Sequence, residues 1–269
     1  MKTSVIITVY NRPEMLIACL RALALQSVRP DEAVVSDDGS NPESVRRLQA
    51  AFGEMPFPVR YVRQDDLGYR LAAARNNAIR ESSGEYLFSL DCDVLLMPDA
   101  LEIHLQHARR GLFLAANRAW VGEQATRALF NKELTPRLLD VLWAGADRRH
   151  LRPAHRQFIR NLLLRKIGLA RRHKPKILGC HFSLFREDIE RVNGFDEHYV
   201  GWGLEDDDFA LRLHQAGIRG HSLIKEARAL HLWHPPAGPQ SKSPLAGPNW
   251  EYFNRRNIPA YCAQGLKRV

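Results

Sequence analysis

Two carboxylates directly after an apolar run are the first residues whose types and spacing suggest chemistry. Residues 85–90 are mostly apolar and β-forming, and Asp91 and Asp93 follow them. Such a run predicts a strand buried on both faces. In open α/β sheets ligands bind beyond the carboxyl ends of the strands, where two acids can hold a divalent cation. Taken alone, the pair is more typical of a turn or of the cap of the helix that follows from Pro98 onward, because so short a pattern has a high false-positive risk.

A second acidic turn follows an earlier β-forming run. Asp37 and Asp38 precede a Gly-Ser pair at the end of residues 30–36. This pattern is typical of a turn with a helix N-cap. Alternatively, an acid at this place accepts hydrogen bonds from a nucleotide base or ribose. The first strand is not followed by G-x-G-x-x-G, which argues against a nicotinamide or flavin protein.

A third acidic group lies at residues 205–208, just after Trp202 and its two flanking glycines. Acids in a first helical turn are favourable to the helix dipole, which would explain the charges alone. The glycines indicate a tight backbone beside a large ring, which suits stacking on a sugar. An acid at the start of the adjoining helix could accept a proton from an acceptor hydroxyl.

The elements that would position these residues alternate between strand and helix. Short connections between them predict a parallel sheet with helices on its faces and right-handed crossovers. The apolar periodicity predicts strands at 4–9, 30–36, 59–62, 85–90 and 177–185, and helices at 13–26, 42–52, 71–79, 186–194 and 209–217.

Four segments in this order resemble the family 2 glycosyltransferases, namely residues 4–12, 34–40, 68–76 and 87–93. The resemblance implies the α/β GT-A fold, a Rossmann-like, mostly parallel sheet flanked by helices, which binds a nucleotide-sugar donor and a divalent metal. It further implies that Thr8, Tyr10, Arg12, Asp37 and Asp38 line the base and ribose, that Arg70, Arg75 and Asp91 face the donor, and that Asp93 ligates the metal.

Residues 193–208 resemble the carboxyl-terminal part of β-1,4-galactosyltransferases and of chondroitin-type polymerases. That resemblance implies that Asp206 is the catalytic base, that Glu205 binds acceptor or donor hydroxyls, and that Trp202 and Gly203 contact the acceptor. Leu204 stands where the galactosyltransferases have another glycine, so donor and acceptor preference are not carried over.

Two histidines follow a further strand-like run, and in similar glycosyltransferases a histidine here completes the metal site. His231 is the first choice, and His234 is the second, as a ligand or a diphosphate contact. Carboxylate and imidazole ligands together suit Mn²⁺ or Mg²⁺ better than a soft metal. The Pro-, Gly- and Ser-rich residues 235–248 are expected to form a loop that closes over the donor.

The net charge of +9 is concentrated in one segment. Residues 148–176 hold eleven Lys or Arg and no acid, so the remainder is net −2. An apolar stripe there predicts an amphipathic basic helix, composed of Phe158, Ile159, Leu162, Leu163 and Ile167 with Arg156, Arg160, Arg165 and Lys166 around them. It is either a core helix with a cationic rim or a contact for anionic lipid head groups. A phosphate-bearing acceptor glycan is a third partner, and nucleic acid is not expected.

These observations lead to one functional hypothesis. We expect a single domain with a nucleotide-sugar-binding half at 1–100, a helical basic insertion at 101–176, an acceptor and catalytic half at 177–234, and a loop and tail at 235–269. The expected activity is inverting, metal-dependent transfer from a nucleotide-diphosphate sugar, with a UDP-sugar favoured. The expected acceptor is a hydroxyl of a bacterial surface glycan such as lipopolysaccharide core, capsule or exopolysaccharide. A phosphorylated or lipid-linked glycan is one form that this acceptor could take.

Two alternatives come from other classes of protein. One is a metal-dependent nucleotidyltransferase, and the other is a non-catalytic basic module that binds nucleic acid or lipid. The four cysteines stand singly, and no stretch approaches the about 20 apolar residues of a spanning helix. We therefore expect a cytoplasmic enzyme, with peripheral attachment to the inner face of the membrane as a further hypothesis.

Overall fold

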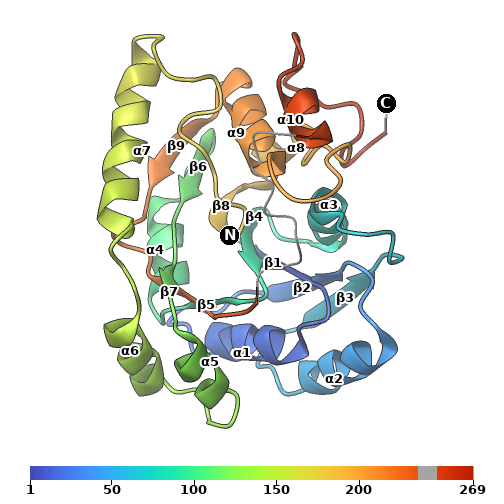
Figure 1. Ribbon diagram of the computed structural model, residues 1–269, viewed down its shortest axis with the longest axis vertical. Coiled ribbons are helices and arrows are strands. Elements are labelled where there is room, and N and C mark those ends of the chain that lie inside the picture. The colour runs from blue at the N-terminus through green and yellow to red at the C-terminus, as the bar shows by residue number, and fades with distance from the viewer. Residues whose placement is uncertain (236–246, 269) are drawn as a thin grey trace.

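The computed structural model describes residues 1–235 and 247–268, and its centre is a seven-stranded sheet in the order β3-β2-β1-β4-β8-β6-β9 (Figure 1). The first four strands are parallel and comprise β1 (Thr3–Val9), β2 (Glu32–Asp37), β3 (Val59–Arg63) and β4 (Tyr86–Asp91). β8 (His181–Phe185) runs antiparallel to both neighbours, and β6 (Leu112–Ala115) pairs in parallel with β9 (Arg219–Ser222).

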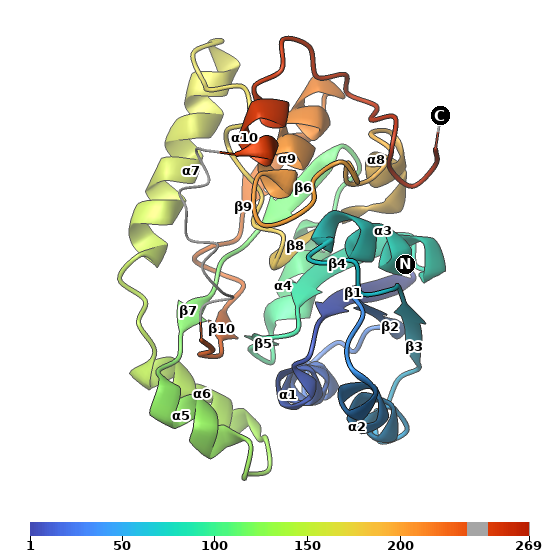
Figure 2. The same ribbon diagram turned by 45° about the vertical axis from the view of Figure 1, so that its right-hand side comes forward.

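Helices cover both faces of this sheet, giving three layers. Figure 2 shows α1 (Pro13–Ala24) and α2 (Pro42–Phe52) below the parallel strands and α3 (Leu71–Glu81) above them. The core on the α1 face also includes α4 (Ala100–His107) and α6 (Pro136–Gly145). The core on the α3 face includes α7 (Leu151–Lys166), α8 (Arg186–Glu190) and α9 (Glu205–Gln215). Proline at the first turn of α1 and α2 has a φ suited to helix initiation.

A second, three-stranded sheet begins just after the carboxyl end of β4. It consists of β5 (Val94–Leu96), β10 (Ala229–His231) and β7 (Ala119–Trp120), in that order. β10 is the central strand, and His231 is the register partner of both Val94 and Trp120. β5 directly follows the acids at the end of β4. Its pairing with β10, and the pairing of β10 with β7, place three segments that are far apart in the sequence side by side.

The structure differs from the expected elements in several places, and α9 begins at Glu205, four residues before the expected start at residue 209. Residues 101–176 include the helix α5 (Glu123–Leu129), but they also include strands β6 and β7, so the segment is not only helical. β8 starts at His181, four residues later than expected. The tail contains a short helix, α10 (Pro248–Phe253), that follows the expected lid, and residues 236–246 of that lid lie outside the described residues.

The predicted apolar face of the basic helix is divided between two sides of α7. Phe158 is buried and Leu162 half-buried, and both pack on the core of the α3 face. Ile159, Leu163 and Ile167 point elsewhere and are 39%, 58% and 67% exposed. One side of the helix therefore belongs to the core, and another leaves three aliphatic side chains in solvent.

Candidate active site

The carboxyl ends of the parallel strands bring the predicted donor-side residues into one row. Thr8 on β1 is the register partner of Asp91 on β4, and Val9 is the partner of Asp37 on β2. Since β1 to β4 all end at the same edge of the sheet, their terminal side chains share one region. This is the place where ligands bind in open α/β sheets.

Three side chains at this edge form a potential cation site. Asp93, His231 and His234 each offer one ligand atom, and these atoms lie within 4.8 Å of one another. One carboxylate oxygen of Asp93 lies 3.4 Å from Nε2 of His231, and the other lies 3.3 Å from Nε2 of His234. Burial lowers the pKa of His231 to about 4, so its imidazole is neutral at pH 7, the form that binds metals.

Unsatisfied buried atoms fit this interpretation. Oδ1 of Asp93 and Nδ1 of His231 are buried and make no hydrogen bond within residues 1–235 and 247–268. Burial would raise the pKa of Asp93, but a hydrogen bond from His234 and the positive charge of Arg12 help to keep that pKa below its ordinary value. Arg12 also donates to Oδ2 of Asp93 at 2.9 Å. One carboxylate and two imidazoles therefore suit a divalent metal cation.

A buried arginine joins the acids of distant segments. The Arg75 guanidinium on α3 is 2.8 Å from Asp206, 3.3 Å from Asp91 and 3.3 Å from Glu205. Asp91 precedes Asp93 by two residues, so one cation links the end of β4 to the first turn of α9. The acids near positions 93 and 206 thus converge on one site, as the sequence predicts.

The two acids at the start of α9 have different surroundings. The Asp206 side chain is 25% exposed, and its oxygens accept hydrogen bonds from Arg75 and from the Gly179 amide at 2.9 Å. Glu205 is only 8% exposed, and its Oε2 has no partner among the described residues. Burial, followed by the neighbouring Asp206 charge, raises the pKa of Glu205 to about 7. Asp206 is therefore the more accessible proton acceptor of the two.

Sequence reasoning missed Gly179 and Tyr69, which shape this site. A Cβ at Gly179 would lie 2.4 Å from the Arg75 guanidinium carbon and 2.4 Å from Asp206 Oδ1. A glycine inside an expected strand is a signal of close backbone approach, and residues 179–180 form a turn before β8. Tyr69 is largely buried beside Glu205 and Asp91, and burial raises the pKa of its hydroxyl. Tyr69 belongs to the 68–76 segment that resembles the family, but no role was assigned to it.

The residues expected around the nucleotide have protein partners of their own. Asp37 is fully buried and accepts from the Tyr61 hydroxyl at 2.6 Å and the Ser40 amide at 2.7 Å. Asp38 accepts from the Arg70 amide at 2.9 Å. Asp37 thus stabilises the turn after β2, as the alternative interpretation holds. A nucleotide role for it stays a prediction, as it does for the exposed Tyr10 and for Arg70.

The Trp202 loop presents its ring to solvent. Trp202 is 52% exposed between Gly201 and Gly203, whose φ values are +82° and +95°. Leu204 also adopts a left-handed φ of +75°, at the glycine position of the galactosyltransferase pattern. Asn249 on α10 donates to the Gly203 carbonyl at 3.1 Å, so the tail supports this loop. An exposed aromatic ring four residues before Asp206 in the sequence is suited to packing on a sugar.

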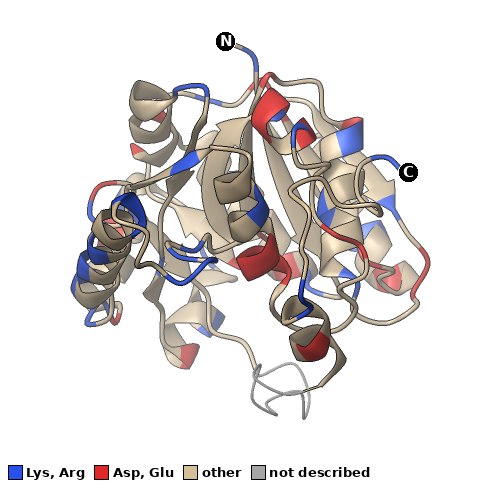
Figure 3. Cartoon of the chain, turned by 90° about the horizontal axis from the view of Figure 1, so that it is seen from above, with Lys and Arg blue, Asp and Glu red and all other residues tan. Residues whose placement is uncertain are grey.

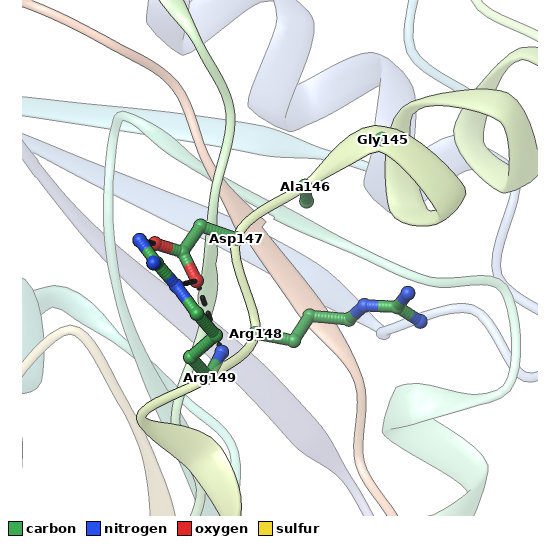
Figure 4. Close-up of a pocket in the computed structure, with 5 residues that line it drawn as sticks. All are labelled: Gly145, Ala146, Asp147, Arg148 and Arg149. Atoms are coloured by element: carbon green, nitrogen blue, oxygen red, sulfur yellow. Dashed lines mark hydrogen bonds and ion pairs between the residues drawn. The ribbon is translucent and has the colours of Figure 1, made fainter.

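Arg118 in the β6–β7 connection and Trp120 on β7 also lie close to the cation site, and no motif in the sequence indicates them. The Trp120 ring is 43% exposed and lies 4.5 Å from the His231 ring, between their centroids. The Arg118 guanidinium lies 5.0 Å from the Trp120 ring centroid. Backbone hydrogen bonds of 3.0 and 2.9 Å join Trp120 to Asp147. Residues 145–149 line a surface hollow of about 420 Å³, in which Arg149 pairs with Asp147 while Arg148 points away from that pair (Figure 4).

The chain belongs to glycosyl transferase family 2, whose model matches residues 4–191. The model described as the N-terminal domain of galactosyltransferase matches residues 167–235. Both expected resemblances are thereby confirmed. Family membership decides against the nucleotidyltransferase and the non-catalytic module as the class of this protein.

Curated relatives agree with this assignment. Validoxylamine A glucosyltransferase of Streptomyces hygroscopicus subsp. limoneus is 33% identical over 230 residues, covering 80% of this chain and 48% of the relative. Chondroitin synthase of Escherichia coli is 28% identical over 265 residues, covering 91% of this chain and 37% of the relative. The chain thus spans about half or less of the length of these relatives.

Solved structures confirm the expected GT-A type of α/β fold. The mannosyltransferase PcManGT from Pyrobaculum calidifontis, in complex with GDP-Man and Mn²⁺, superposes with a TM-score of 0.58 at 19% identity, covering 88% of this chain and 58% of that one. GalNAc-T7 with UDP, GalNAc and Mn²⁺ gives a TM-score of 0.62 at 15% identity, covering 88% and 44%. Within the described residues, every helix is too short or too polar to cross a bilayer.

Proposed function

We propose that this protein transfers a sugar from a nucleotide-diphosphate donor, with a UDP-sugar favoured, to a hydroxyl of a bacterial surface glycan, with inversion at the anomeric carbon. The observation that carries the proposal is the convergence of a cation site (Asp93, His231 and His234) with an accessible carboxylate, Asp206. Family membership supports it, as do relatives named as a glucosyltransferase and a chondroitin synthase. Lipopolysaccharide core, capsule and exopolysaccharide are the candidate acceptors.

Asp93, His231 and His234 would hold Mn²⁺ or Mg²⁺. When bound, such an ion offsets the negative charge of the diphosphate leaving group. Two solved neighbours contain Mn²⁺ with GDP-Man or with UDP, which supports this choice of ion and donor. Arg75 holds Asp91 and Asp206 in a fixed arrangement, so little reorganisation is required of these acids when substrates bind.

The chemical step assigned to this chain is a proton transfer at Asp206. An acceptor hydroxyl gives its proton to the Asp206 carboxylate while its oxygen forms a bond to the anomeric carbon. The bond from that carbon to the diphosphate oxygen breaks, and the electron pair leaves with the diphosphate. The Oε2 atom of Glu205 has no hydrogen-bond partner among the described residues, and it would accept a hydrogen bond from a sugar hydroxyl. Trp202 would pack against the acceptor ring.

Replacement of Asp206 by asparagine tests this step, because the amide keeps the shape but accepts no proton. We expect turnover to fall by about 10²- to 10⁴-fold, with binding of UDP and Mn²⁺ retained. Asp207→Asn is the matched control, since Asp207 occupies the same turn and its nearest cation is Lys174 at 4.0 Å. The assay uses a panel of nucleotide sugars with Mn²⁺. Turnover of Asp206→Asn at the wild-type rate would refute the assignment.

We further propose that α7 attaches the protein to an anionic membrane surface. Its exposed side holds Ile159, Leu163 and Ile167, and Leu169 just beyond the helix is 70% exposed. Lys and Arg recur along α7, at the left of Figure 3. Aliphatic side chains that can enter the head-group region, combined with cations worth about 1 kcal/mol each near anionic lipid, suit peripheral binding.

Flotation with vesicles of phosphatidylglycerol and phosphatidylcholine tests the attachment. We expect binding at low salt, less binding at high salt, and a clear loss in the double variant Ile159→Ser/Leu163→Ser. A matched control is Val141→Ser, which removes another exposed aliphatic side chain, 61% exposed on α6. Wild-type protein that stays unbound at low salt would end this proposal without affecting the transferase assignment.

A further inference from the structure

The Arg118 side chain is a cation of the site without an acid of its own. Arg12 is paired with Asp93, and Arg75 with Asp91, Glu205 and Asp206. Arg118 makes no ion pair within residues 1–235 and 247–268, and its Nε atom is buried without a hydrogen-bond partner there. A buried polar group in this state costs free energy unless a ligand or water satisfies it.

Several observations place this guanidinium beside the reacting groups. It stands 5.0 Å from the centre of the Trp120 ring, and that ring stands 4.5 Å from His231. Burial lowers the pKa of Arg118, but Cys180 and the carboxylates of Asp91, Asp93 and Asp206 outweigh it, so the net pKa is raised. The side chain is therefore charged and within electrostatic reach of three site acids, although it pairs with none.

The anchoring of this connection is rigid. The Arg118 carbonyl lies 3.0 Å from Nε2 of His150, and its amide donates to Oδ1 of Asn117 at 2.8 Å. Trp120 is fixed by its pairing with His231 on one side and with Asp147 on the other. The backbone at Arg118 and the Trp120 ring are thus held in place beside the cation site, and among the described residues the Arg118 guanidinium forms no ion pair.

We infer that Arg118 and Trp120 form a substrate subsite in which the guanidinium binds an oxyanion, phosphate or carboxylate, and the indole packs against the attached sugar or its neighbour. An arginine fork matches the two oxygens of either group. The oxyanion comes either from the donor diphosphate or from an acid on the acceptor. This inference rests on the proposed function and adds to it a specificity for a negatively charged group on the substrate.

Calorimetric titration of UDP with Mn²⁺ is the first arm of the test. If the oxyanion belongs to the donor, Arg118→Gln should weaken UDP binding about tenfold, the loss of one charge-assisted contact of about 1.4 kcal/mol. Arg118→Lys should recover part of that loss. The matched control is Arg149→Gln, since Arg149 is 91% exposed, lies in the turn before α7 and pairs with Asp147. It should bind UDP as the wild type does.

Quenching of tryptophan fluorescence by glucuronate, glucose 6-phosphate and glucose is the second arm. If the oxyanion belongs to the acceptor, wild type should prefer the two acidic sugars over glucose, and Arg118→Gln should abolish that preference while UDP binding stays unchanged. Trp120→Phe should reduce the quenching signal. Equal UDP affinity in Arg118→Gln together with no preference for acidic sugars in the wild type would overturn the inference. Wild-type protein that binds no nucleotide at all would instead contradict the proposed function.

Discussion

Replacing Glu205 by glutamine should make the protein more stable at pH 8, although it alters the active site. Burial and the Asp206 charge raise the pKa of Glu205 from 4.5 to about 7. The folded protein therefore binds this proton more tightly than the unfolded chain does. Stability falls as pH rises from the unfolded pKa to the folded one, and above pH 7 the full cost of the buried charge is present.

The size of the effect follows from the shift. One pKa unit corresponds to about 1.36 kcal/mol. Relative to low pH, the raised pKa of Glu205 therefore lowers the free energy of unfolding by about 1 kcal/mol at pH 5 and about 3 kcal/mol at pH 8. Glutamine keeps the shape without the charge, and Arg75 retains Asp91 and Asp206 as partners. Glu205→Gln should therefore gain about 1–3 kcal/mol over wild type at pH 8, and clearly less at pH 5.

Urea unfolding at pH 5, 6, 7 and 8 measures this difference directly. The control is Glu251→Gln on α10, an exposed glutamate whose replacement should leave the unfolding free energy within about 0.5 kcal/mol at every pH. A Glu205→Gln protein that is no more stable than wild type at pH 8, or whose gain does not depend on pH, would refute the reasoning. The same variant should lose turnover, because the neutral glutamine amide is a weaker hydrogen-bond acceptor for the sugar hydroxyl than the Glu205 carboxylate.

Two further predictions concern the cation site and the backbone behind Asp206. Asp93→Asn and His231→Ala should each weaken Mn²⁺ binding by about 10- to 100-fold or more, measured by electron paramagnetic resonance. The control His155→Gln on α7 should bind Mn²⁺ as the wild type does. Unchanged Mn²⁺ binding in both site variants would show that Asp93 and His231 do not hold the metal. Gly179→Ala should displace Arg75 or Asp206 and lower turnover at least about tenfold, while Gly53→Ala, where a Cβ meets nothing within 4 Å, should not; wild-type turnover in Gly179→Ala would contradict the close packing seen at that position.

The first third of the fold could be predicted from sequence because local pattern and final structure agree there. Pro42 at a first helical turn and an apolar stripe predict α2 with its observed bounds. Strand β6 could not be predicted, because residues 112–115 are a short apolar run beside basic and polar neighbours. Only pairing with β8 and β9 stabilises it as a strand.

The site was predictable where a motif carries it and not where only tertiary structure does. Asp93, Asp206 and His231 belong to recognisable patterns, and the structure brings them together. Arg118 stands alone in a segment without a pattern, and its position depends on the pairing of β7 with β10. Helical periodicity likewise identifies the apolar residues of α7, but it cannot say that Phe158 faces the core while Leu163 faces solvent.

An anomalous difference map from crystals soaked with Mn²⁺ and UDP shows directly whether the cation site and Asp206 serve one reaction. We expect one strong peak bonded to Asp93 and to His231, His234 or both, with the diphosphate beside it and Asp206 near the bound nucleotide. A manganese peak away from Asp93, or UDP bound at a distance from Asp206, would contradict this expectation.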